Sequence, residues 1–217
     1  MSQIFSLDNR LSACASLVRK NARLADIGTD HAYLPVWLLL NNKISYAIAS
    51  DINPSPLEMG RATAEKYKVQ SIDFRLGNGL GSITKEDNIT DIVIAGMGGE
   101  IISEIIINSP LTKDESLNII LQPMTKSEEL IKNLYKMGFE IVKQNCAVSN
   151  NKCYTIMKVH YRGKSVDVQE EFCYLGKLDL KDEKSIRFVN QHIKHLENKS
   201  KGDSNYKRLA DILKKSL

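Results

Sequence analysis

The 217-residue sequence has few cysteines, and their spacing fits neither a metal site nor a redox pair. It contains no CxxC pair and no histidine at metal-ligand spacing from a thiol. Free thiols in a cytoplasmic protein are the simplest interpretation, and we expect no bound metal. The four cysteines are Cys14, Cys146, Cys153 and Cys173.

Long apolar runs are also absent. No stretch reaches the ~20 residues of a membrane-spanning helix, so we expect no membrane partner. The first residues, MSQIFSLDNRLSA, lack both the basic start and the apolar stretch of a signal peptide. The composition, with 42% hydrophobic and 26% charged residues, is typical of a globular domain with a buried core. The length suits one domain with an appendage.

No strong excess of one charge is visible until the net +4 is divided along the chain. Residues 1–159 are balanced, and the whole excess falls in residues 160–217. A second local excess precedes the first glycine loop, where only Asp8 opposes it. Basic patches on both sides of a neutral domain suit a polyanion, although solvated helix faces would give the same pattern. The basic residues before the loop are Arg10, Arg19, Lys20 and Arg23.

Strand and helix patterns alternate up to about residue 138. Strands are predicted at 24–27, 45–51, 72–76, 91–95 and 117–121, and helices at 7–21, 32–40, 53–68, 100–107 and 127–137. This alternation predicts a doubly wound, Rossmann-like α/β sheet. Two strands at 139–149 and 152–160, joined by Asn150 and Asn151, then predict a hairpin that makes the sheet seven-stranded with one antiparallel strand. Such a hairpin favours methyltransferases that use S-adenosylmethionine over dehydrogenases.

The rest of the chain is helical and polar. Helices at 180–199 and 205–217 are predicted, with Asp203 or Ser204 as the cap between them, and they would form an αα-hairpin. We expect a catalytic domain at 1–160 and a small helical extension at 161–217. So short a helix pair should lean on the main domain or on a partner, and we expect a monomer or a weak homodimer.

Glycine is scarce where the first loop of a nucleotide-binding fold usually has three. Here Gly28 is followed by Thr29, Asp30 and His31. Gly28 permits close approach of a ligand, and free N–H groups of the turn would hold a carboxylate. Asp30 disfavours a pyrophosphate and favours a cationic amine or sulfonium. The loop therefore suits a positively charged amino-acid cofactor and not a dinucleotide.

Polar groups follow the next three strands. Asp51 comes 23 residues after Gly28, where a carboxylate accepts ribose hydroxyls, although a helix N-cap is the alternative. Asn78 lies between two glycines and would reach the exocyclic amine of an adenine, although a plain turn explains the motif equally well. Ala95-Gly96-Met97-Gly98-Gly99 leaves room for a flat ligand.

The fifth strand is followed by Gln122-Pro123, a polar contact for an incoming base. The (Asp/Asn)-Pro-Pro-aromatic motif, with which many methyltransferases grip an exocyclic amine, is absent from the fourth strand end. We therefore do not expect methyl transfer to an exocyclic amine.

The segments DIGTDHAYLP at 26–35, AGMGG at 95–99 and QP at 122–123 together resemble the bacterial tRNA adenine-N1 methyltransferases that act on adenine 22. The polar tail resembles that family's coiled-coil-like extension, so the resemblance spans essentially the whole chain. One departure is Asn78, where the family has Asp; an amide can still meet the adenine edge.

The resemblance implies S-adenosyl-L-methionine as cofactor and tRNA as substrate. It places the cofactor at Asp26, Gly28, Thr29, Asp51, Ile52, Asn78, Gly79, Ala95, Gly96 and Met97. It places the substrate at Gly98, Gln122, Pro123 and the basic residues Arg10, Arg19, Lys20 and Arg23, which we expect to border the cleft. Tail lysines such as Lys194 and Lys207 would touch the RNA more distantly.

The chemistry that the resemblance implies assigns roles to the polar and aromatic residues after Gly28. Adenine N1 lies on the Watson–Crick edge, so the base must leave its stack. N1 carries a lone pair and needs no general base, but the methylated base is a cation. Asp30 would stabilise that charge by ~2–4 kcal/mol. His31 or Tyr33 would stack on the base, although a structural hydrogen bond and packing are their respective alternatives.

Three other functions share parts of this pattern. A methyltransferase of a small molecule or protein would share the cofactor residues and be indifferent to RNA. A nicotinamide-dependent oxidoreductase would share the α/β layout, but Asp30 and the missing glycines disfavour it. A non-catalytic nucleotide-binding interaction module would use the tail for docking.

Overall fold

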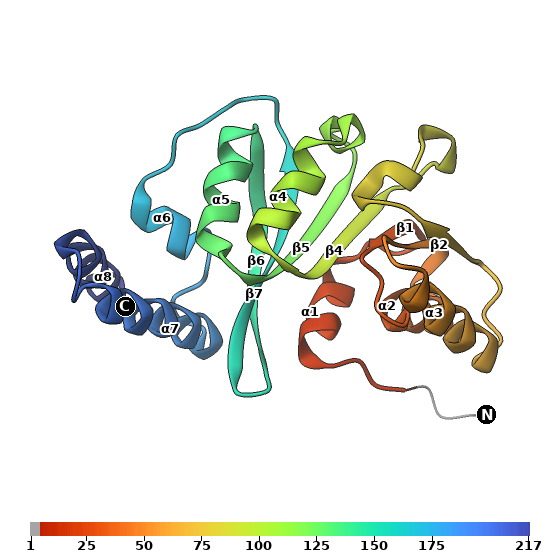
Figure 1. Cartoon of the computed structure of the whole chain (residues 1–217), viewed down its shortest axis with the longest axis horizontal. Helices are drawn as coiled ribbons and strands as arrows, with labels where there is room; N and C mark the ends of the chain where they lie inside the picture. Colours follow the sequence, from red (N-terminus) through yellow and green to blue (C-terminus); the bar gives the residue numbers. More distant parts are fainter. Residues whose placement is uncertain (1–4) are drawn as a thin grey trace.

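The computed structural model describes residues 5–217; residues 1–4, the start of the segment compared with a signal peptide, lie outside the described residues. Within that range the chain builds one seven-stranded sheet in the order β3-β2-β1-β4-β5-β7-β6 (Figure 1). The first five strands are parallel, and β7 is antiparallel to both β5 and β6. The predicted sheet and hairpin are confirmed. The strands are β1 Ala22–Ile27, β2 Ile44–Asp51, β3 Ile72–Leu76, β4 Asp91–Gly98, β5 Asn118–Thr125, β6 Phe139–Ser149 and β7 Lys152–Tyr161.

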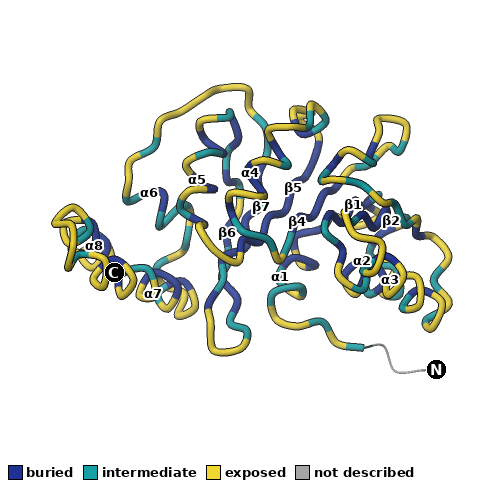
Figure 2. Tube along the Cα trace, in the orientation of Figure 1, coloured by how far each residue is buried: buried dark blue, intermediate teal, exposed yellow. Residues whose placement is uncertain are grey.

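Helices cover both faces of the sheet, because successive side chains of a buried strand point to opposite sides. In β4, Ile92 and Ile94 pack with the helices α4 and α5, whereas Val93 packs with α1 and α2. Figure 2 shows the result: dark, buried strands between helices whose outer sides are exposed. The helices are α1 Asn9–Leu17, α2 Tyr33–Leu40, α3 Pro54–Lys66, α4 Gly99–Ile107, α5 Ser127–Lys136, α6 Glu170–Leu175, α7 Glu183–Lys199 and α8 Ser204–Ser216.

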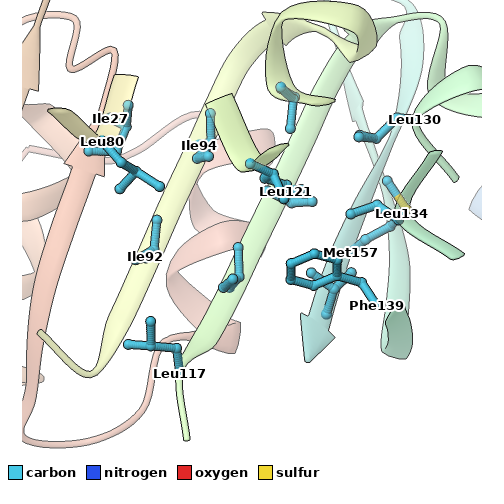
Figure 3. Close-up of a cluster of buried hydrophobic side chains, with 14 of the residues drawn as sticks. Ile27, Leu80, Ile92, Ile94, Leu117, Leu121, Leu130, Leu134, Phe139 and Met157 are labelled. Carbon is cyan, nitrogen blue, oxygen red and sulfur yellow. The ribbon is translucent and has the colours of Figure 1, made fainter. Parts of the chain in front are cut away.

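The core on the α4 and α5 face is built mainly of branched aliphatic side chains. Ile94 and Leu121 of neighbouring strands meet Leu130 and Leu134 of α5 in this cluster (Figure 3). Burial of four such side chains contributes on the order of 6–12 kcal/mol. This face therefore anchors the central strands whose carboxyl ends carry the glycine and Gln-Pro motifs.

Three element ends differ from the sequence prediction and affect the site. Helix α1 ends at Leu17 and not near Asn21, because the backbone N–H of Arg19 donates to the buried carboxylate of Asp91 at 2.9 Å and draws the chain into β1. Strands β4 and β5 run on to Gly98 and Thr125, which pair with each other. Residues 95–98 of the glycine motif and the Gln-Pro motif therefore lie in strands, and Gly99 begins α4.

The tail packs on the hairpin, as expected for so short a helix pair. The Gln191 side chain of α7 accepts from the backbone N–H of Cys153 at 2.8 Å and donates to its carbonyl at 2.9 Å. Phe188 of α7 is buried with Cys146 and Cys153. Asp203 caps α8 by accepting from Asn205 N at 2.9 Å, as predicted. The six-residue helix α6 was not predicted. The proposed division at residue 160 stays a prediction.

Across residues 5–217, no helix has both the length and the apolar character needed to cross a membrane. The same residues contain no cluster of three His, Cys, Asp or Glu side chains that could hold a metal ion.

Candidate functional site

A cavity of about 420 Å³ opens at the carboxyl ends of β1, β2, β4 and β5. In α/β sheets of this kind, ligands bind at that edge. The cavity brings together residues from every strand end that the sequence indicated except β3. Its lining is Asp8, Arg10, Leu11, Asp26, Gly28, Asp30, Tyr33, Leu34, Asp51, Ala95, Gly96, Met97 and Met124.

The β1 loop adopts a conformation that only part of its sequence favours. Gly28 has φ +74°, and His31 and Ala32 have φ of 58° and 53°, the left-handed region that L residues rarely adopt. Such residues persist where the surrounding structure holds them, and they cluster at ligand sites. The backbone N–H groups of Gly28 and Thr29 both donate to Ser50 O, at 2.8 and 3.0 Å. These two N–H groups are therefore not the free donors that we expected for a carboxylate.

Asp26 is a buried carboxylate beneath this loop. The Thr29 hydroxyl donates to it at 2.7 Å and favours the charged form. Burial has the larger effect and raises the pKa of Asp26 to about 6, with a further contribution from Asp51. A nearby cation stabilises the charged form of such a buried carboxyl group, so the floor of the cavity suits a positively charged ligand.

Asp30 and Tyr33 lie at the rim of the cavity, whereas His31 is not among its lining residues. The Asp30 side chain is 84% exposed, and its Oδ1 lies 3.3 Å from His31 Nε2. The His31 and Tyr33 rings are parallel within 2°, with centroids 5.4 Å apart, and Phe5 meets Tyr33 edge-on. Tyr33 remains 42% exposed. The rim therefore presents a carboxylate beside an aromatic surface that remains open.

Asp51 ends β2 and has a structural contact as well as a place in the cavity. Its Oδ1 accepts from the backbone N–H of Asn53 at 2.8 Å, just before α3. Asn53 stands at the N-cap position of α3 without a side-chain hydrogen bond. Ile52 follows and is 59% exposed, an apolar side chain beside the cavity's acidic edge.

Asn78 and Gly79 do not line this cavity. They line a neighbouring one of about 440 Å³, together with Ile101, Glu104 and Asn108 among others. The structure thus separates the β3 end from the other strand ends, and the proposed contact of Asn78 with an adenine stays a prediction.

The glycines of the β4 motif differ in what surrounds them. Gly96 has φ +81°, and a Cβ there would meet no atom within 4 Å, so it borders open space. Gly99 packs against the β5–α5 turn, where a Cβ would stand 2.2 Å from Lys126 O. The methyl group of Met97 lies over Gly28, 1.9 Å from where a Cβ would stand. Gly96 therefore borders the cavity, and Gly99 holds α4 in place.

Gln122 connects the two central strands with α1. It is completely buried, and its Oε1 accepts from Gly96 N at 3.2 Å and from Arg10 Nη1 at 3.1 Å. Its Nε2 donates to Pro123 O at 2.8 Å. Arg10 also donates to Asp8 Oδ2 at 2.8 Å and contacts Met124 Sδ at 3.3 Å. Gln122 thus positions Arg10 over the cavity.

Four lining residues of this cavity are not among the predicted site residues: Asp8, Leu11, Leu34 and Met124. Asp8 caps α1 by accepting from Leu11 N at 2.8 Å, and an acidic residue before an apolar periodic run is a recognisable cap signal. Met124 carries no such signal.

The expectation that all four basic residues border the cleft is wrong for three of them. Arg19 donates to Asp91 Oδ1 at 2.8 Å, and Arg23 donates to Asp87 O at 2.9 Å and lies 4.2 Å from the Tyr46 ring centroid. These contacts lie at the amino ends of β1 and β4, opposite the cavity. Lys20 lies between them in the turn before β1. Only Arg10 of this group lines the cavity.

The comparisons with known proteins agree with the fold. A family model described as a methyltransferase domain matches residues 7–157. The class defined by fold and match is therefore the methyltransferases.

Three relatives narrow the class. The Bacillus subtilis (strain 168) tRNA (adenine(22)-N(1))-methyltransferase is 36% identical over 154 residues, which are 70% of this chain and 63% of that relative's length. A Streptococcus pneumoniae protein, a candidate tRNA methyltransferase of the same specificity, was solved with S-adenosyl-L-methionine. It is 30% identical with a TM-score of 0.82, over 96% of this chain and 97% of that one. M. capricolum TrmK, solved with S-adenosyl-homocysteine, is 26% identical with a TM-score of 0.79, over 98% of this chain and 96% of that one. The chain belongs to the family of tRNA (adenine-22) N1-methyltransferases.

Proposed function

We propose that this protein transfers the methyl group of S-adenosylmethionine to N1 of adenine 22 in tRNA, and that it does so in the cytoplasm. The observation that carries the proposal is the acidic cavity at the carboxyl ends of β1, β2 and β4, in a chain whose S. pneumoniae relative was solved with this cofactor.

The residues present fit the cofactor. Buried Asp26 and exposed Asp30 give the cavity a negative potential, which suits a ligand with a sulfonium and an amine. Asp51 keeps one carboxylate oxygen beyond its bond to Asn53 for ribose hydroxyls. The open space beside Gly96 accepts a flat group. When bound, the cofactor supplies an electrophilic methyl group.

The chain's own task is then to place the adenine and to stabilise charge. The base must leave its stack, and the exposed ring of Tyr33 offers it a surface. N1 attacks with its lone pair, so the rate depends on alignment with the methyl group and not on a general base. The product base carries a positive charge until N6 releases a proton. The carboxylate of Asp30 faces solvent at this rim, where it stabilises that charge and accepts the proton.

The test is methyl transfer from labelled S-adenosylmethionine to an unmodified tRNA transcript, followed by nucleoside mass spectrometry. N1-methyladenosine is the expected product. Suppose that the protein binds the cofactor and methylates a small molecule or protein but no tRNA. The tRNA substrate would then be wrong, and the assignment as a methyltransferase would stand. Absence of cofactor binding would favour an interaction module.

A further inference from the structure

Apart from the cavity beside the β3 end, the cofactor cavity has another neighbour, called here the second cavity. It has a volume of about 430 Å³ and lies between the β5–α5 turn, the β6–β7 hairpin and α7. It is distinct from the cofactor cavity and is not explained by it. The side chains that matter here are Met124, Lys126, Glu128, Tyr154, His195 and Lys199.

The two cavities are neighbours. Met124 lines both of them. Arg10, which lines the first, contacts Met124 Sδ at 3.3 Å and lies over the ring of Tyr154, 5.6 Å from its centroid, in the wall of the second. A tRNA segment whose base enters the first cavity would therefore have the second cavity within reach.

The walls of the second cavity combine rings with cations. Tyr154, Phe188, His192 and His195 contribute rings, and Lys199 contributes a positive charge. Lys126 also lines the cavity, but it is paired with Glu100 and with Glu129. The His192 ring is fixed edge-on against Phe188, with centroids 4.7 Å apart. Burial lowers the pKa of His192 to about 4, so this ring is neutral at physiological pH. Aromatic rings with nearby cations are the usual means of holding an unpaired nucleotide, by stacking and by phosphate contact.

Glu128 adds a polar group that lacks a partner. Its Oε2 is buried and makes no hydrogen bond within residues 5–217, although the residue lines the cavity. A buried acceptor of this kind costs free energy unless a donor reaches it. The Watson–Crick edge of a base carries such a donor on an exocyclic amine or a ring N–H.

The cavity is also held in a fixed shape. Gln191 makes two hydrogen bonds to the backbone of Cys153, and Arg187 donates to Asn151 O at 2.9 Å, so α7 is tied to the hairpin. A preformed site loses less conformational entropy on binding than a mobile one.

From these observations we propose that the second cavity binds one unpaired nucleotide of the tRNA, near the target adenine, by stacking and through its base edge. The proposal rests on the proposed function, because it takes tRNA as the substrate. It gives the tail a defined role: α7 completes a nucleotide site, and the tail is more than a basic surface.

The test uses the full-length protein with His195→Ala and with Asn198→Ala as the matched control. Both residues are exposed on α7, but Asn198 does not line the cavity. Tyr154 is a less clean choice, because it also meets Arg10. We expect His195→Ala to raise the KM for tRNA roughly tenfold, as loss of one stacking partner does. We expect kcat and the Kd for S-adenosylmethionine to stay unchanged, and Asn198→Ala to match the wild type throughout.

A second measurement separates this proposal from the proposed function. Ultraviolet cross-linking of 4-thiouridine-substituted tRNA, with peptide mapping, should place cross-links on the peptides that contain Tyr154 or His195. Wild-type methylation of adenine 22 with an unchanged KM in His195→Ala and no such cross-link overturns the nucleotide site alone. Cross-links at these peptides without methylation of any tRNA overturn the proposed function and support the site.

Discussion

Arg10 and Gln122, 112 positions apart in the chain, meet at the cavity formed by the carboxyl ends of β1, β2 and β4, with Arg10 Nη1 3.1 Å from Gln122 Oε1. The same Gln122 oxygen accepts from Gly96 N. One amide therefore fixes both the glycine that leaves space in the cavity and the cation that covers it. This relationship explains why a buried glutamine stands in a strand where the sequence suggested a contact with the base.

Arg10 and Lys20 should behave differently although both precede the glycine loop. We expect Arg10→Ala to lower kcat/KM for tRNA about tenfold or more, because a cation at the cavity mouth is lost. Lys20→Ala should leave kcat/KM within about twofold, because Lys20 lies at the opposite edge of the sheet. Steady-state kinetics at fixed salt will check this. Equal losses of kcat/KM in both variants would show that RNA also contacts the amino ends of the strands.

Asp30 should matter for the chemical step more than for binding. Asp30→Ala and Asp30→Asn remove the charge at the rim, and we expect kcat to fall by roughly 30-fold or more, as for other preorganised electrostatic groups. Glu58→Gln removes an exposed carboxylate from α3 and serves as the control. Single-turnover rates at saturating tRNA will measure the effect. Near-normal rates in both Asp30 variants would remove this residue from the mechanism.

Asp26 should make the free energy of unfolding fall as pH rises, the opposite of what a carboxyl group with a lowered pKa does. Its folded-state pKa of about 6 lies above the ordinary value of 3.8, so the folded state holds the proton more tightly. This contribution is fully present below pH ~4 and is lost as pH rises through about 6, by up to roughly 3 kcal/mol. Asp26→Asn does not titrate. The variant's Tm should therefore rise relative to wild type between pH 4.5 and 7.5, as followed by thermal unfolding. Parallel pH profiles would contradict the raised pKa.

Gly99 should tolerate no side chain. A Cβ at this position would stand 2.2 Å from Lys126 O, a backbone atom that cannot move independently of the turn. We expect Gly99→Ala to destabilise the fold by about 1–3 kcal/mol, a fall in Tm of roughly 3–10 °C. Gly81→Ala is the matched control, because a Cβ there would meet nothing within 4 Å. A Gly99→Ala protein as stable as this control would show that the turn adapts.

The elements that the sequence predicted well are those set by local physics. Continuous apolar runs, buried on both faces of the sheet, produced the strands β2 and β4. Asn150-Asn151, both with positive φ, produced the hairpin turn. The six-residue helix α6 was missed because so short a segment shows no helical periodicity. The place of Arg19 and Arg23 was missed for another reason. Which edge of a sheet a charge reaches depends on the path of the chain before β1, and that path depends on Asp91, 72 positions after Arg19.

In the site, too, features set by local sequence were predictable, and features set by contacts between distant segments were not. The acidic loop and the glycine motif were recognisable because their residue types are unusual at strand ends. The use of the Gly28 and Thr29 N–H groups by Ser50 was not, because it depends on how β2 pairs with β1. The second cavity was not predictable either, since its wall joins β5, β7 and α7.

The most direct test of the central claim compares two tRNA transcripts that differ only at position 22. The account predicts that the protein methylates N1 of adenine 22 with S-adenosylmethionine, and that a transcript with guanine at this position accepts no label. Equal labelling of both transcripts, or methylation of another nucleoside, would contradict it.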